Sequence, residues 1–174
     1  NVMESWQEAL KCAFGNEAQY KINGEDNVAL LALEDIELGE VILVTSEIDK
    51  PGLKKLGNAM LRAKARGMSV SWLVGHEYIL EHKDSKVLMN AISTIRKNGV
   101  NVQYINSTFD NLVILPYVGV VLWGERSWMT EQTPQHIIAM ENRSSDILAR
   151  LRELHDLKPA AHPQKVTDQA EATA

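Results

Sequence analysis

One stretch of this acidic chain gathers positive charge on what the pattern predicts to be a single helix face. The basic side chains opposite its apolar positions are Lys50, Lys54, Lys55, Arg62, Lys64 and Arg66. Lysine and arginine neutralise phosphates and release the counterions around a nucleic acid, so this spacing could form a backbone-binding patch. A solvated helix face has the same pattern. The candidate contacts to phosphate or nucleic acid are therefore Lys54, Lys55, Arg62 and Arg66, and the solvated face remains the alternative.

The other residues that could do chemistry have no spacing that points to a site. The histidines are scattered along the chain and lack the clustering that a zinc site needs. Cys12 is the single cysteine, so it forms no disulfide within the chain, and its amphipathic segment predicts a small buried side chain. The sequence also lacks a Walker loop and the GxGxxG, HExxH and GxSxG motifs. We therefore expect neither a metal nor a cofactor.

Composition limits the class of protein. With 174 residues, of which 45% are hydrophobic and 24% charged, the chain can bury a core, and whole-chain disorder is excluded. The net charge of −5 excludes a generally basic coat but allows a local basic patch. No apolar run approaches the length of about 20 residues that spans a membrane, so we expect no membrane span and a cytoplasmic protein. Residues 1–156 are expected to form a single domain, and residues 157–174, which lose periodicity, a disordered tail.

The middle of the chain alternates between predicted strands and predicted helices. Apolar, β-branched runs at 40–45, 68–74 and 100–105 are predicted strands, and continuous runs of this kind are typical of parallel sheets covered on both faces. Amphipathic helices are predicted between them at 52–66 and 86–98. Because helical crossovers join parallel strands, the three strands should be parallel neighbours in one sheet.

The flanking segments complete the expected fold. Two apolar runs at 111–115 and 118–124 are predicted to form a hairpin or meander, and a long final helix is predicted from Thr133 to His155. The remaining predicted elements are a helix at 4–14, a strand at 18–23, a helix at 27–38 and a polar loop at 75–84. Together they predict an α/β fold with a central, mostly parallel sheet, helices on both faces, and extra N- and C-terminal helices.

The segment from Ala63 to Leu73, AKARGMSVSWL, resembles the phrase A-x-x-RG-V-x-V-x-x-L of the phospholipase D superfamily. The flanking segments VILVTSEIDKPGLKKL and LMNAISTIRKNGVNVQYI are similar to the family's neighbouring phrases, and the resemblance extends over residues 27–129. That family is built around a His-x-Lys-x4-Asp motif. The resemblance implies the family's α/β fold. Because members with a single motif pair two copies, it also implies a homodimer, or docking onto an active partner or a larger chain.

The motif itself is replaced in this chain. Alignment with the family places Phe109 at the histidine position, Asn111 at the lysine position and Pro116 at the aspartate position, while Ser127 falls in the family's Gly-Ser-x-Asn element. In the family the histidine attacks phosphorus and the lysine supplies charge to the developing oxyanion. A phenyl ring cannot attack, an amide carries no charge, and a proline cannot orient a base. The resemblance therefore implies the fold without the reaction.

These observations favour a catalytically inactive phospholipase D-like domain that acts in binding or assembly, as a homodimer or docked onto a protein partner. Two alternatives remain open. One is a nucleic-acid-binding or nuclease-associated module that uses the basic helix at 50–66. The other is a phosphodiesterase whose atypical site lies elsewhere in the fold.

Overall fold

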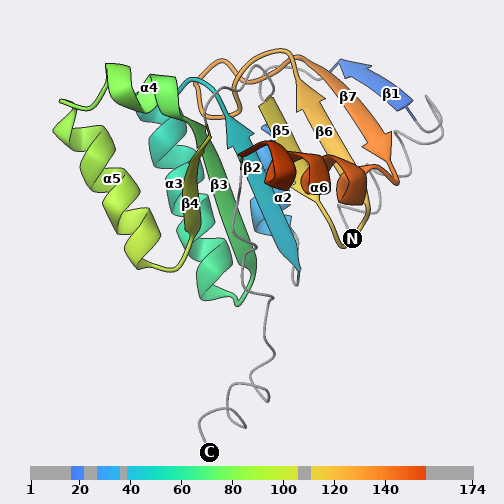
Figure 1. The fold of residues 1–174 in the computed structure, drawn as a ribbon, viewed down its shortest axis with the longest axis horizontal. Helices are drawn as coiled ribbons and strands as arrows, with labels where there is room; N and C mark the ends of the chain where they lie inside the picture. Colours follow the sequence, from blue (N-terminus) through green and yellow to red (C-terminus); the bar gives the residue numbers. More distant parts are fainter. Residues whose placement is uncertain (1–16, 22–26, 36–38, 106–110, 156–174) are drawn as a thin grey trace, which may run out of the picture.

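The computed structural model describes residues 17–21, 27–35, 39–105 and 111–155 (Figure 1). Its strands are β1 (Glu17–Lys21), β2 (Glu40–Thr45), β3 (Ser69–Gly75), β4 (Asn101–Ile105), β5 (Asn111–Leu115), β6 (Val120–Gly124) and β7 (His136–Glu141). Its helices are α2 (Val28–Asp35), α3 (Lys50–Ala65), α4 (His76–Glu81), α5 (Lys86–Lys97) and α6 (Ser144–His155). The predicted helix at 4–14 and the predicted tail at 157–174 lie outside the described residues.

The strands form one sheet in the order β1-β7-β6-β5-β2-β3-β4. Strands β2, β3 and β4 are parallel neighbours, as predicted, with α3 and α5 as the crossovers. The pairings from β2 through β5, β6 and β7 to β1 are antiparallel. The prediction of an α/β fold is confirmed, but its mostly parallel sheet is corrected to a mixed sheet. For β5 and β6 the physical reason is the short turn that joins them, because a short turn allows only antiparallel pairing.

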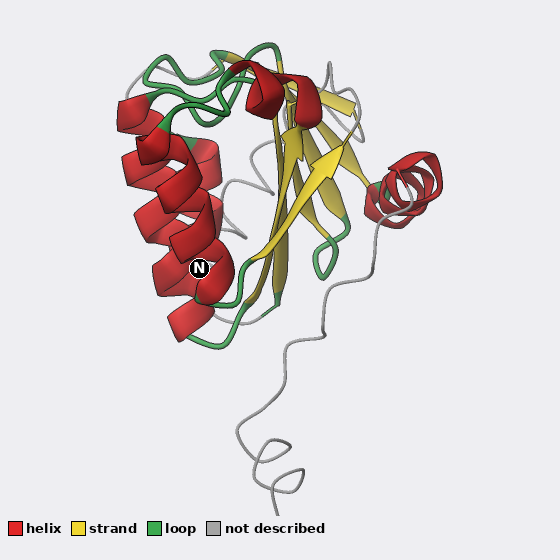
Figure 2. Ribbon diagram, turned by 60° about the vertical axis from the view of Figure 1, so that its left-hand side comes forward, coloured by secondary structure: helices red, strands yellow, loops and turns green. Residues whose placement is uncertain are grey.

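Helices cover both faces of the sheet, as predicted (Figure 2). Helices α2, α3 and α5 pack on one face, where the largest cluster of buried side chains includes Leu56, Met60, Trp72 and Ile92. Helix α6 packs over β5 and β6 on the other face, where Leu148 joins a smaller buried cluster. Among the described residues, no helix is long and apolar enough to cross a membrane.

The predicted final helix from Thr133 to His155 is wrong in its first part. Residues 136–141 form strand β7, in which buried Ile137 and Ala139 alternate with less buried neighbours. The helix begins only at Ser144, after Asn142 turns the chain with a φ of +59°. An apolar pair such as Ile137-Ile138 fits a strand or a helix equally, so periodicity over so short a run could not decide between them.

Two other local predictions change. The predicted polar loop at 75–84 contains the short helix α4, and the predicted helix at 27–38 is described as α2 from Val28 to Asp35. The backbone N–H of Leu30 donates to Asn27 Oδ1 at 3.0 Å, so Asn27 caps this helix.

Candidate functional site

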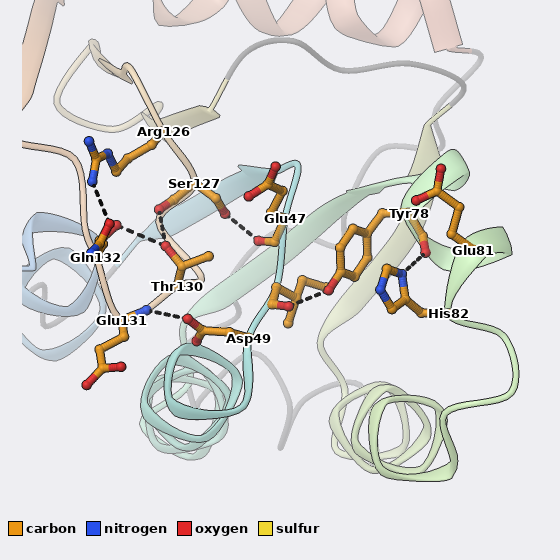
Figure 3. Close-up of a pocket in the computed structure, with 11 residues that line it drawn as sticks. Glu47, Asp49, Tyr78, Glu81, His82, Arg126, Ser127, Thr130, Glu131 and Gln132 are labelled. Atoms are coloured by element: carbon orange, nitrogen blue, oxygen red, sulfur yellow. Dashed lines mark hydrogen bonds between the residues drawn. The ribbon is translucent and has the colours of Figure 1, made fainter.

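A cavity of about 780 Å³ opens where β2, β3 and β6 end, at the edge where open α/β sheets commonly bind ligands (Figure 3). Its walls come from the segment after β2, from α4, and from the loop after β6. The lining residues are Glu47, Ile48, Asp49, Tyr78, Glu81, His82, Arg126, Ser127, Thr130, Glu131 and Gln132. Because these segments are far apart in sequence, no single motif could reveal the cavity.

Helix α4 contributes an aromatic pair to this cavity. The rings of Tyr78 and His82 stack with their centroids 4.0 Å apart, and His82 Nδ1 donates to the carbonyl oxygen of Tyr78 at 2.9 Å. The Tyr78 hydroxyl donates to the carbonyl oxygen of Ile48. Burial raises the pKa of Tyr78 above its ordinary value, and the nearby carboxylates of Glu47, Asp49 and Glu81 raise it further. Tyr78 is therefore a neutral donor at neutral pH.

Asp49 joins the first turn of α3 to the loop after β6. Its Oδ1 accepts from the backbone N–H of Gly52 at 2.8 Å, and its Oδ2 accepts from the backbone N–H of Glu131, also at 2.8 Å (Figure 3). The close approach requires a glycine at position 52, because a Cβ there would lie 2.0 Å from the carbonyl oxygen of Met129. The N-terminus of α3 is thus already occupied by groups of this chain.

Glu125 joins the two ends of the same loop. Its carboxylate accepts backbone hydrogen bonds from Gln135 and His136, each at 2.9 Å, and Arg126 lies 3.5 Å away. Partial burial of Glu125 tends to raise its pKa, but the backbone hydrogen bonds from Gln135, His136 and its own N–H and the charge of Arg126 together outweigh that effect, and the pKa lies below its ordinary value. Two carboxylates therefore hold backbone amides of this loop: Asp49 holds that of Glu131 in its middle, and Glu125 holds those of Gln135 and His136 at its end.

The structure brings together two of the positions that the resemblance aligns with the family motif, Asn111 and Ser127. Asn111 begins β5 and is 5% exposed, and its Oδ1 accepts from both the N–H and the hydroxyl of Ser46, at 3.1 and 2.9 Å. Ser127 is also buried, and its hydroxyl donates to the carbonyl oxygen of Glu47 at 2.5 Å and accepts from Met129 N. Both side chains therefore hold the segment that follows β2. Pro116 follows the opposite end of β5, roughly 17 Å away by the rise of a strand, and Phe109 lies outside the described residues.

The basic helix face divides into two pairs. Lys54, Lys55, Arg62 and Arg66 are all exposed. Arg62 pairs with Glu34 at 2.8 Å, and Arg66 donates to the carbonyl oxygen of Leu33, so both arginines bind α2 to α3. Within the part of the chain that the structure describes, Lys54 and Lys55 form no ion pair.

The cavity at the sheet edge is acidic. The described residues that line it include four carboxylates, those of Glu47, Asp49, Glu81 and Glu131, but one arginine, Arg126. No three His, Cys, Asp or Glu side chains within the described ranges are grouped so that they could hold a metal ion. Sequence reasoning missed Tyr78 and His82 because it assigned 75–84 to a loop. Their spacing of four residues, which places two rings on one helix face, was the available signal.

Comparison with known proteins identifies similar folds, but it does not identify a family for this chain. No family model matches the chain, and no curated protein matches its sequence. Polyphosphate kinase from Porphyromonas gingivalis is similar in structure, with a TM-score of 0.63 and 13% identity over 97% of this chain and 31% of that one. TrmBL2, described as an archaeal chromatin protein with a novel mode of DNA binding, has a TM-score of 0.47 and 14% identity over 87% of this chain and 58% of its own. The chain thus spans about a third of the kinase and just over half of TrmBL2, and the similarity to the kinase shows the fold alone.

Proposed function

We propose that this chain is a catalytically inactive phospholipase D-like domain that acts in binding or assembly. The observation that carries the proposal is the burial and hydrogen bonding of Asn111. At the position of the family's lysine, this side chain is uncharged and buried, and its oxygen is engaged by Ser46. The structural similarity to polyphosphate kinase, a phospholipase D-superfamily member, is compatible with this fold.

The chemistry at the neighbouring positions supports the same proposal. Phosphoryl transfer through a covalent intermediate needs a nucleophile, and Phe109 offers a hydrocarbon ring. It also needs positive charge or donors aimed at the phosphate oxygens. The Ser127 hydroxyl is already hydrogen-bonded to Glu47 and Met129, so it does not serve as such a donor.

The charge of the cavity also disfavours a phosphodiester substrate. A phosphodiester carries a negative charge, and the carboxylates of Glu47, Glu81 and Glu131 lie around the space that it would enter. Repulsion of this kind lowers both the encounter rate and the affinity. A binding role that does not require phosphate in this cavity is consistent with that charge.

The test is hydrolysis of bis-p-nitrophenyl phosphate and of phosphatidylcholine. Purified protein should show the rate of buffer alone, and His82→Ala and Asn111→Ala should leave that rate unchanged. Turnover that His82→Ala abolishes would instead support the atypical-site phosphodiesterase. Turnover that disappears with Asn111→Ala would overturn the proposal directly. Light scattering on the same sample measures whether the chain is a homodimer, as the resemblance implies.

A second candidate function is nucleic-acid binding by the basic helix. The observation that favours it is that Lys54 and Lys55 are exposed and form no ion pair within the described residues. If they contact phosphates, log affinity for DNA falls linearly with log salt, and Lys54→Glu with Lys55→Glu should reduce that slope by about two units. The loss should be equal for all sequences, because a phosphate contact does not read bases. Native protein that does not retard DNA at low salt would remove this candidate.

A further inference from the structure

Helices α3 and α5 lie side by side in the helical layer (Figure 1). A groove lies between them. It has a volume of about 410 Å³, and its lining residues on α3 run from Lys50 to Leu61. Most of its lining is apolar or small, and the described residues that form it are Lys50, Leu53, Lys54, Gly57, Asn58, Leu61, Val87, Ala91, Thr94 and Ile95. Gly57 forms part of the floor, where an added Cβ would meet Ile95 Cδ1 at 3.4 Å.

The groove exposes apolar surface that a partner would cover. Val87 is 58% exposed at the start of α5, and Leu61 and Ala91 are only partly buried. Removing such surface from water is favourable in proportion to its area. Side chains spaced along one face of a helix, at i, i+3 or i+4 and i+7, enter a groove between two helices in this way.

The charge at the groove has one sign. Lys50 and Lys54 line it, none of the described lining residues is acidic, and neither lysine forms an ion pair with a described residue. The chain as a whole has a net charge of −5, so this cationic rim contrasts with the rest of the protein. Complementary charge across an interface selects the partner and speeds association.

Three classes of occupant can be compared against these observations. A second copy that docked by the same groove would bring Lys50 and Lys54 of both copies together, and like charges oppose such a two-fold contact. A nucleic acid would use the lysines but leave Val87 and Leu61 uncovered. We infer that the groove between α3 and α5 binds an amphipathic helix of a partner protein, whose apolar stripe is flanked by Asp or Glu. This inference names the partner class and the surface, and it rests on the proposed binding role.

The test is selection from a displayed library of helical peptides about 18 residues long, or five turns. Hydrophobic residues occupy one face of each peptide, and the flanking positions vary among Glu, Lys and Gln. Binders to the native protein should be enriched in Glu at the flanks. Their dissociation constants should rise about tenfold with Lys54→Glu, because the change replaces attraction by repulsion, and a similar rise is expected for Val87→Asp.

Two matched variants control for a general effect of charge or exposure. Lys55→Glu makes the same change on the same helix outside the groove lining, and Leu80→Asp changes another exposed apolar residue, 55% exposed on α4. Both should leave affinity within about twofold, and circular dichroism should show that all four variants fold. Enrichment of Lys-flanked peptides, equal loss from Lys54→Glu and Lys55→Glu, competition by a short DNA duplex, or no enrichment would each overturn the inference. The hydrolysis assay tests the proposed function separately, so the two failures are distinguishable.

Discussion

The side chain of Asn111 continues the pairing of β2 with β5 beyond the point where the strands themselves stop pairing. The register places Val44 opposite Leu112, and the next contact runs from Ser46 to the Asn111 amide oxygen, at 3.1 Å from the backbone nitrogen and 2.9 Å from the hydroxyl. A side chain thus satisfies a backbone donor that would otherwise lack a ladder partner. The position that the resemblance aligns with the family's lysine here supports the sheet edge.

Replacing Asn111 by alanine should lower the free energy of unfolding by about 1–3 kcal/mol, because the partly buried backbone donor of Ser46 loses its acceptor. The midpoint of urea unfolding, compared between proteins whose unfolding free energy falls with urea at the same slope, measures this loss. Asn101→Ala is the matched control, since Asn101 is only partly buried and makes one bond, 3.3 Å long, to Ser71. Equal effects of the two variants would show that the Ser46 contact is not important to stability.

Gly52 and Gly57 lie on the same helix but should respond oppositely to alanine. At Gly52 the new Cβ would lie 2.0 Å from the carbonyl oxygen of Met129, so Gly52→Ala must displace backbone and should destabilise the protein. At Gly57 the nearest atom is the flexible end of Ile95, at 3.4 Å, and alanine gains up to about 1 kcal/mol of helix propensity. Thermal unfolding compares the two variants. A stable Gly52→Ala variant would mean that the 125–135 loop does not pack on α3 as described.

Much of the fold can be predicted from the sequence, and most of the cavity cannot. The strands β2 and β5 and the Ser85 cap of α5 follow from local signals, namely apolar runs and a capping serine before an amphipathic segment. Strand β7 could not be recognised, because its pairing with β1 and β6 decides its conformation. The cavity depends on long-range contacts, such as the one between Asp49 and Glu131, which leave no spacing signal.

Stability on the acid side should depend on Glu125. Its pKa is lowered in the folded protein, so its contribution is complete above the ordinary value of 4.5 and is lost as the pH falls through the lower folded value. Glu125→Gln should therefore be less stable than the native protein at pH 7, and the difference should narrow below about pH 4.5. Urea unfolding between pH 7 and pH 3 measures this. The control is Glu77→Gln, an exposed residue of α4. A difference that stays constant across this range would contradict the role of the carboxylate.

Replacing each of the two pairs of cations on α3 by alanine should change the free energy of unfolding by different amounts. Arg62 and Arg66 contact Glu34 and the Leu33 carbonyl of α2, whereas Lys54 and Lys55 contact no described acidic group. The Arg62–Glu34 pair is exposed and contributes little, but the bond from Arg66 to a backbone carbonyl adds to it, so the arginine double variant should lose about 1–2 kcal/mol.

The lysine double variant should stay within about 0.5 kcal/mol of the native protein, as is usual for exposed side chains without partners. Urea midpoints measure both variants, and an unchanged unfolding slope would confirm that the same surface is exposed on unfolding. In DNA retardation at low salt, only the lysine variant reports on phosphate contacts, because a loss of binding in the arginine variant could follow from movement of α2. Equal stability of the two variants would contradict the α2–α3 contacts. It would favour the interpretation that all four cations lie on one solvated helix face.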